Sequence, residues 1–253
     1  MQLSSLLNSM RYYCQNVTAT HVLYAASDET FAEAYARLQK TFSDVVFLKE
    51  SNFRIDLIRL LSTVNYRLVF FLVDDLIFTD FFDASMLSQV DTSKYVLSLR
   101  LHPGVTYSYM THLSQKPPPL KAVGQDTFSF SWKNDAIDWA YPLSVDGHIF
   151  ERKTILSIIN KCQFRAPNSL EASMQAFTTL FSTKFQGLCY KMPKIVNFPV
   201  NRVQIEFENR AGENTAKEFL DLFHQGYEID FLHYEKSAHN SVHVDTELAL
   251  KKK

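Results

Sequence analysis

The chain has 253 residues and the composition of an ordinary soluble globular protein, with 46% hydrophobic and 21% charged residues. Its 26 basic and 27 acidic residues give a net charge of −1, which excludes a protein that binds nucleic acid through a strong overall positive charge. The three cysteines lie far apart, so neither a disulfide framework nor a cysteine-rich zinc site is expected. We therefore expect a protein of a reducing compartment, the cytoplasm, and its length suits one domain.

Three common sequence signals are absent. Residues 1–20 lack the basic start and apolar run of an export signal. The apolar stretch at residues 68–73 is far shorter than the roughly 20 residues that a membrane helix needs, so no membrane span is expected. The chain has six glycines, and they form neither GxGxxG nor GxxxxGK[ST]. This excludes a Rossmann dinucleotide site, a P-loop and a kinase glycine loop.

Strand and helix patterns alternate over the first hundred residues. Residues 21–26, 45–48 and 67–73 are short β-prone runs and are expected to be strands. Asp28 and Asn52 are expected to cap the helices between them. This order predicts a βαβαβ unit, and hence an α/β protein with a mostly parallel central sheet and helices on both faces.

The rest of the chain continues with mixed elements. The proline triplet at 117–119 marks a surface excursion. Further strands are expected at 95–101, 127–132 and 228–232, and helices around 155–159, after 168–169 as far as 181, and at 214–223.

Residues 71–78, FLVDDLIF, contain two adjacent acids within an apolar run. Asp74 and Asp75 follow the third predicted strand, and ligands of open α/β sheets bind beyond the carboxyl ends of parallel strands. Ser27 and Asp28 follow the first strand and are expected to face the same crevice. Adjacent carboxylates in apolar surroundings are costly unless a cation neutralises them, and Mg²⁺ or Mn²⁺ prefers carboxylate and phosphate oxygens. The alternative is that the pair simply ends a strand at the surface.

A second stretch, residues 139–150, combines aromatic, acidic, glycine and histidine residues just before a predicted helix. Trp139, Asp146 and His148 suit a sugar-binding loop, in which rings stack on the sugar and side chains bind its hydroxyl groups. A buried turn in which the aspartate caps the helix is an equally good interpretation.

Glu171 lies in a third stretch, residues 166–171, where Asn168 and Ser169 are expected to cap a helix. Glu171 then falls in the first turn of this helix. There its carboxylate could face the crevice and act as a general base. It could equally be a capping-box acid that accepts a hydrogen bond from a backbone amide and is stabilised by the helix dipole.

These stretches belong to a wider set of segments that point to one family. The segments are residues 24–29, 52–56, 71–75, 98–101, 141–148, 167–171, 199–204 and 241–245. Together they resemble a small glycosyltransferase of the GT-A fold, similar to compact sugar transferases of bacteria and large DNA viruses. The resemblance runs from about Val22 almost to the C-terminus. Residues 73–75, VDD, stand where the family has its DxD motif, with the first acid missing.

The resemblance implies one glycosyltransferase domain over residues 1–253. Its nucleotide-sugar-binding half is expected at about 20–101 and its acceptor-binding half at about 102–253. The donor would be a nucleotide-diphosphate sugar, with a UDP-sugar favoured. The implied donor-binding residues are Ser27, Asp28, Asp56, Arg59 and Asp74.

The family resemblance also implies a metal ion. In such enzymes Mn²⁺ or Mg²⁺ bridges the diphosphate of the donor. Asp75 would be the carboxylate ligand and His243 the late histidine ligand, with His239 as the next candidate.

The acceptor would be a hydroxyl group of a glycan or glycoconjugate, lying over Trp139 and His148. In an inverting enzyme a carboxylate takes the proton of this hydroxyl group. Glu171 follows Asp75 by 96 residues, roughly where inverting GT-A enzymes have their base, and Asp146 is the second choice.

The function that the resemblance implies is metal-dependent, inverting transfer of a hexose or deoxyhexose. A retaining mechanism stays open, because nothing in the sequence determines the stereochemistry. A sugar nucleotidyltransferase shares the architecture, but it normally has a glycine-rich loop after the first strand, and residues 24–28 contain no glycine. A non-catalytic carbohydrate-binding module also stays open, and it would bind glycan without nucleotide or metal.

Overall fold

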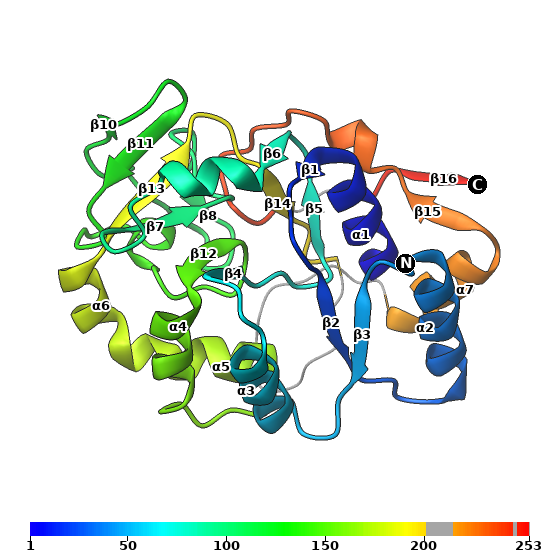
Figure 1. Ribbon diagram of the computed structural model, residues 1–253. Coiled ribbons are helices and arrows are strands. Elements are labelled where there is room, and N and C mark those ends of the chain that lie inside the picture. Colours follow the sequence, from blue (N-terminus) through cyan, green and yellow to red (C-terminus); the bar gives the residue numbers. More distant parts are fainter. Residues whose placement is uncertain (201–214, 245–246, 253) are drawn as a thin grey trace.

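The computed structural model describes residues 1–200, 215–244 and 247–252, which form a mixed α/β structure (Figure 1). Its largest sheet has six strands in the order β10-β11-β13-β7-β12-β4. In this order the strands are β10 (Lys121–Ala122), β11 (Thr127–Phe130), β13 (Gln186–Tyr190), β7 (Tyr95–Ser98), β12 (His148–Glu151) and β4 (Leu68–Phe70).

This sheet is mostly antiparallel, so the predicted parallel central sheet is wrong. β13 and β7 run parallel, whereas the other four neighbouring pairs run antiparallel. The difference comes largely from β12, where Ile149 pairs with Leu97 of β7 on one side and with Phe70 of β4 on the other. β12 lies within residues 139–150, whose sequence pattern indicates a loop or turn and not a strand.

The first predicted βαβ unit is present as a separate two-stranded sheet. β2 (His21–Tyr24) and β3 (Val46–Lys49) pair in parallel and are connected by α2 (Glu29–Thr41). The predictions that Asp28 caps α2 and that Asn52 caps α3 (Phe53–Thr63) are confirmed. The third strand of the predicted unit does not join this sheet, since β4 pairs with β12 instead.

Four further strand pairs complete the described part of the structure. The pair that matters for the site is antiparallel and joins the chain after Asp75 to the chain before Phe198. The pairs are β5 (Leu76–Phe78) with β14 (Ile195–Asn197), β1 (Cys14–Gln15) with β6 (Phe82–Asp83), β8 (Tyr107–Ser108) with β9 (Leu113–Ser114), and β15 (Tyr227–Ile229) with β16 (Leu250–Lys252).

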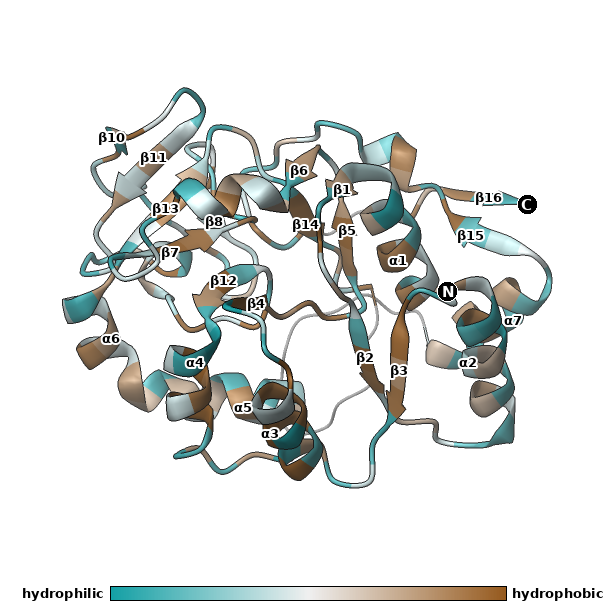
Figure 2. Cartoon of the chain, in the orientation of Figure 1, coloured by the Kyte–Doolittle hydropathy of each residue, from teal (hydrophilic) through white to brown (hydrophobic). Residues whose placement is uncertain are grey.

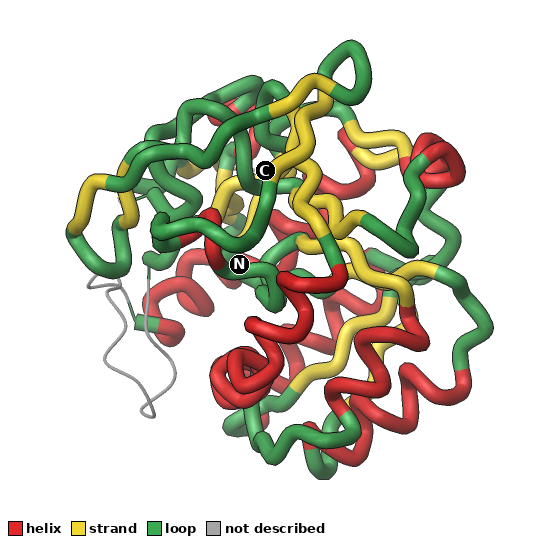
Figure 3. The backbone as a smooth tube through the Cα atoms, turned by 90° about the vertical axis from the view of Figure 1, so that its left-hand side faces the viewer, coloured by secondary structure: helices red, strands yellow, loops and turns green. Residues whose placement is uncertain are grey.

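The remaining described helices are α1 (Gln2–Tyr13), α4 (Arg152–Ile159), α5 (Pro167–Met174), α6 (Thr178–Lys184) and α7 (Ala216–His224), with 3-10 turns at Ala84–Gln89, Asp138–Ala140 and Phe231–Tyr234. In Figure 1, α3, α4, α5 and α6 lie below the six-stranded sheet, whereas α1, α2 and α7 lie at the right, near β2, β3 and β5. Figure 3 shows the same helices and strands from the side. The long helix predicted after residues 168–169 is divided by a 3-10 turn at Gln175–Phe177. None of the described helices is long and apolar enough to cross a membrane.

Buried apolar side chains form three clusters. In Figure 2 the strands β3 and β5 are among the most apolar elements. The first cluster combines Leu57 and Leu61 of α3 with Phe150 of β12 and Met174 of α5. Residues from both predicted halves of the chain therefore pack in one cluster, and the division into a donor half and an acceptor half remains a functional prediction.

Candidate functional site

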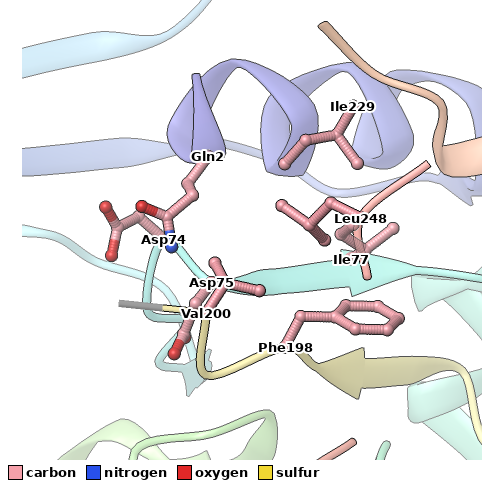
Figure 4. Close-up of a pocket in the computed structure, with 8 residues that line it drawn as sticks. All are labelled: Gln2, Asp74, Asp75, Ile77, Phe198, Val200, Ile229 and Leu248. Carbon is pink, nitrogen blue, oxygen red and sulfur yellow. The ribbon is translucent and has the colours of Figure 1, made fainter. Parts of the chain in front are cut away.

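Asp74 and Asp75 form a turn between β4 and β5, with Asp74 exposed and Asp75 half-buried. Figure 4 shows their carboxylates pointing in different directions, that of Asp74 on the side of Gln2 and that of Asp75 away from it. Apolar side chains, among them Ile77 and Phe198, line the pocket beside the turn. The acidic pair therefore lies at the border between an apolar pocket and solvent.

Asn197, the last residue of β14, contacts Asp75 directly. Its Nδ2 donates a hydrogen bond of 2.9 Å to Asp75 Oδ1. The next residue, Phe198, donates its backbone N–H to the Asp75 carbonyl oxygen, also at 2.9 Å. Because β14 pairs with β5, the sheet register itself brings Asn197 beside the acidic turn.

His243 reaches the same place from the C-terminal segment. It forms an isolated parallel bridge with Asn197, and the Val244 N–H donates to the Asn197 carbonyl oxygen at 2.9 Å. His243 Nε2 lies 3.7 Å from Asp146 Oδ2. Two residues that the sequence predicts as metal ligands, Asp75 and His243, thus both neighbour Asn197.

Asp146 forms a buried ion pair with Arg100, which follows β7. Arg100 Nη1 lies 2.8 Å from Asp146 Oδ2, and the two side chains are only 3% and 10% exposed. Burial acts to raise the pKa of Asp146, but the interactions with His243 and Arg100 outweigh it and hold this pKa below its ordinary value. Asp146 is therefore an ionised carboxylate held by two basic neighbours.

Glu171 lies on α5 and faces the same network. Its Oε1 accepts a hydrogen bond of 3.0 Å from the Val145 N–H, next to Asp146 in the chain. Burial, and then repulsion by Asp146, raises the pKa of Glu171. The two candidate bases are thus neighbours whose pKa values are shifted in opposite directions, the pattern expected of an acid and base pair.

The prediction that Glu171 lies in the first helical turn is wrong. Pro167 is the first residue of α5 and Ala166 is the N-cap, so Glu171 lies in the second turn. Proline suits the first helical position because its missing N–H is not needed there. The Ser169 hydroxyl oxygen accepts from the backbone N–H groups of Arg165 and Ala166, so Glu171 is not the capping acid.

The negative charges gathered around Asp75 fit a cation. Burial, followed by the negative charges of Asp74 and Asp146, raises the pKa of Asp75 well above its ordinary value. Asn197 Oδ1 and His243 Nδ1 are buried and have no hydrogen-bond partner among the described residues. No group of three His, Cys, Asp or Glu side chains within residues 1–200, 215–244 and 247–252 could hold a metal. A metal here would therefore need Asp75 and His243 together with oxygen atoms of another kind.

The predicted donor-binding residues outside the acidic turn hold local structure. Asp28 Oδ1 accepts from the Phe31 N–H at 3.1 Å as the cap of α2, beside the exposed Ser27. Asp56 Oδ2 accepts from the N–H groups of the two residues that precede α3, at 2.7 and 2.9 Å, and these bonds lower its pKa. Arg59, 69% exposed, lies 3.4 Å from Asp56. The contacts described for these four residues are all local, and their donor-binding roles stay predictions.

A cavity of about 990 Å³ lies between β2 and β4. Tyr24 of β2, Tyr35 of α2 and Phe71 after β4 contribute aromatic side chains to its lining, and Asp74 lies at its edge. The Tyr24 and Tyr35 rings are 4.2 Å apart, tilted by 31°. The lining does not include Ser27, Asp28, Asp56 or Arg59.

Trp139 and His148 belong to the core, which differs from their predicted position at an acceptor site. Both side chains are fully buried, at 0% exposure. Trp139 Nε1 donates to the Val105 carbonyl oxygen at 3.0 Å, and His148 Nδ1 lies 3.1 Å from the Pro142 carbonyl oxygen. Burial lowers the pKa of His148 to about 3. Neither ring offers a face for stacking on a sugar.

The other histidine candidate, His239, lies in a different contact. Its carbonyl oxygen accepts a hydrogen bond of 2.9 Å from His102 Nε2. Burial lowers the pKa of His239. Parts of the resembling segments, residues 201–204 and 245, lie outside the described residues.

Two residues of the site were not predicted, namely Arg100 and Asn197. A signal for Arg100 exists, because a basic residue follows a buried strand in an otherwise apolar run, SLRL. Asn197 gives no such signal, since its place depends on the pairing of β14 with β5.

No protein-family model matches the chain. Among curated proteins, the chain is similar to the bifunctional glycosyltransferase pgtA of Dictyostelium discoideum, with 26% identity over 259 residues. The match covers 88% of this chain and 32% of that protein, so the chain spans about a third of the length of this relative.

Proposed function

We propose that this protein is a metal-dependent, inverting glycosyltransferase of the GT-A type. It transfers a hexose or deoxyhexose from a nucleotide-diphosphate sugar, with UDP-sugars favoured, to a hydroxyl group of a glycan or glycoconjugate. The observation that carries the proposal is the position of Asp146 between a proposed metal ligand and the proposed base. Asp146 lies 3.7 Å from His243, forms an ion pair with Arg100, and is close enough to Glu171 to raise its pKa. Sugar transfer needs such a neighbourhood, because the leaving diphosphate and the attacking hydroxyl group react at one carbon atom.

The cavity between β2 and β4 is the proposed place of the nucleotide. It is large enough for a small-molecule ligand and combines apolar walls with a few polar groups. Asp74 lines both this cavity and the pocket beside Asp75. A nucleotide in the cavity would therefore have its diphosphate close to the acidic turn.

Asp75 and His243 are the proposed protein ligands of the metal. A bound divalent cation would supply positive charge to stabilise the leaving diphosphate. The carboxylate of Asp146 favours a proton on the nearer ring nitrogen of His243, Nε2, and leaves Nδ1 with its lone pair. This arrangement is typical of metal-binding histidines, whose other ring nitrogen donates to a carboxylate or carbonyl group.

Glu171 is the proposed base. Its raised pKa gives it a higher proton affinity than an ordinary carboxylate, which suits a group that takes a proton as the new bond forms. The Val145 N–H and the Ser144 side chain both donate hydrogen bonds to the Glu171 carboxylate and hold it in place. Asp146 is less suited to this role, because Arg100 stabilises its ionised form.

Thermal unfolding with added ligands tests the proposal. We expect UDP or a UDP-sugar to raise the unfolding temperature with Mn²⁺ present and to have little effect without it, since a ligand of the native state stabilises it. GDP and GDP-sugars are tested in the same way, and we expect them to raise the unfolding temperature less than UDP and UDP-sugars do. Stabilisation by glycan alone, independent of nucleotide and metal, would instead support a carbohydrate-binding module.

A further inference from the structure

Asn197 is the residue that connects the two proposed metal ligands. Its side-chain Nδ2 donates to Asp75 Oδ1 at 2.9 Å. Its backbone carbonyl oxygen accepts from the Val244 N–H at 2.9 Å, and the residue bridges His243. The side chain therefore lies against Asp75, while the backbone holds the segment that carries His243.

The oxygen of the same amide is buried without a partner. Asn197 is only 3% exposed, and its Oδ1 has no hydrogen-bond partner within the part of the chain that the structure describes. Buried polar atoms are nearly always paired, so the orphaned oxygen next to a carboxylate is available to a bound ion or a water molecule. A rotation of the amide that gave Oδ1 another partner would break the hydrogen bond from Nδ2 to Asp75.

The chemistry of the orphaned atom fits a hard divalent cation. Amide oxygens ligate such cations alongside carboxylates, and Mg²⁺ is commonly held by one or two carboxylates together with substrate phosphates. The described residues supply no third His, Cys, Asp or Glu side chain for the metal. His243 Nδ1 is also buried and unpaired among these residues, so the two residues joined by the Asn197–His243 bridge each carry one unsatisfied atom.

We propose that Asn197 is a ligand of the divalent cation, through Oδ1, while its Nδ2 orients the Asp75 carboxylate. This inference rests on the proposed metal-dependent function. It adds a neutral oxygen ligand to the pair Asp75 and His243.

The test measures Mn²⁺ binding by calorimetry, with and without UDP, so no turnover is needed. Asn197→Leu keeps the approximate shape of the side chain and removes both polar atoms. It should weaken Mn²⁺ binding by about tenfold or more, the scale seen when groups around a metal are removed. Asn197→Asp keeps an oxygen at the ligand position and loses the donor to Asp75, so it should stay within about threefold of the wild type.

Thr215→Ala is the control for a general loss of stability. Thr215 is the N-cap of α7, and its hydroxyl group bonds with Glu218 and not with Asp75 or His243. If Asn197→Leu does not fold, Asn197→Ala takes its place, with folding checked by circular dichroism. Wild-type affinity in the variant that folds would overturn the inference, as would equal losses in Asn197→Asp and Asn197→Leu. Absence of Mn²⁺ binding by the wild type in both conditions would overturn the metal-dependent function as well.

Discussion

Arg100 Nη1 lies 2.8 Å from Asp146 Oδ2, and this ion pair is almost completely shielded from solvent. Asp146 also neighbours His243, a proposed metal ligand, and raises the pKa of Glu171, the proposed base. A buried pair with good geometry costs little, but a buried charge left alone is strongly destabilising. We therefore expect the positive charge of Arg100 to be needed to keep the Asp146 carboxylate buried between His243 and Glu171.

Arg100→Met should therefore destabilise the protein by about 3–5 kcal/mol, because it leaves the Asp146 carboxylate buried without its partner. Urea unfolding of the protein without ligands measures this. Arg59→Met is the matched control, since it removes the arginine of an exposed pair with Asp56 and should have a far smaller effect. Equal effects of the two substitutions would show that the Arg100–Asp146 pair is not important for stability.

Glu171→Gln should keep donor binding and lower sugar transfer by about 10²-fold or more, the usual scale for a general base. The amide oxygen of glutamine can still accept from the Val145 N–H, so the local structure should persist. Initial rates of transfer and calorimetry with UDP measure the two properties.

Asp146→Asn serves as the comparison for the base assignment. If Glu171→Gln transfers sugar at nearly the wild-type rate while Asp146→Asn does not, the base is Asp146. If both variants are active, the base-assisted inverting mechanism is wrong and a retaining mechanism is the better interpretation.

His148 should make stability depend on pH. Its pKa in the folded protein is lowered to about 3, from an ordinary value of 6.5, because the ring is buried. Between these values the unfolded chain binds the extra proton, so stability is lost as the pH falls from about 6.5 toward 3. His148→Asn keeps a donor for the Pro142 carbonyl oxygen and cannot titrate, so it should reduce this slope by up to one proton.

Urea unfolding between pH 4 and 7 measures the slope for the wild type and the variant. His112→Asn is the control, because this histidine is exposed and its φ of 58° is one that asparagine tolerates. If the unfolding free energy of His148→Asn depends on pH as steeply as that of the wild type, the lowered pKa of His148 is contradicted. His102 and His239, whose pKa values burial also lowers, contribute with the same sign in both proteins.

Trp139→Phe should lower stability without changing the KM for the acceptor. The substitution leaves the Val105 carbonyl oxygen without its donor in the core, which costs about 1–3 kcal/mol. Chemical unfolding and acceptor titration in a transfer assay separate the two effects. A raised KM for the acceptor with unchanged stability would instead support the predicted acceptor-binding role of Trp139.

The local elements could be predicted from the sequence because their signals are local. Asp28 and Asn52 cap their helices through bonds to amides three residues on, at 3.1 Å each. The direction of the sheet could not be predicted, because it depends on β12 pairing with β7 and β4, strands about 50 and 80 residues earlier in the chain.

The candidate site shows the same division. Acids at a strand junction, Asp74 and Asp75, are visible in the sequence because carboxylates in an apolar run are unusual. The partners of Asp75 and Asp146 are not visible, since Asn197 and Arg100 reach them only through the fold. The buried position of Trp139 could not be predicted, because an aromatic residue in a loop looks the same in the sequence whether its ring faces a sugar or the core.

The most direct test of a metal-dependent glycosyltransferase is the release of nucleotide from a panel of UDP-, GDP- and dTDP-sugars, measured with and without Mn²⁺. We expect the wild type to release UDP from at least one UDP-sugar in the presence of Mn²⁺ and Asp75→Ala to release none while remaining folded. Asp80→Asn, which changes the carboxylate just beyond the other end of β5, should keep the activity. Failure of the wild type to release nucleotide from any of these sugars, or equal release by Asp75→Ala, would contradict the proposed function.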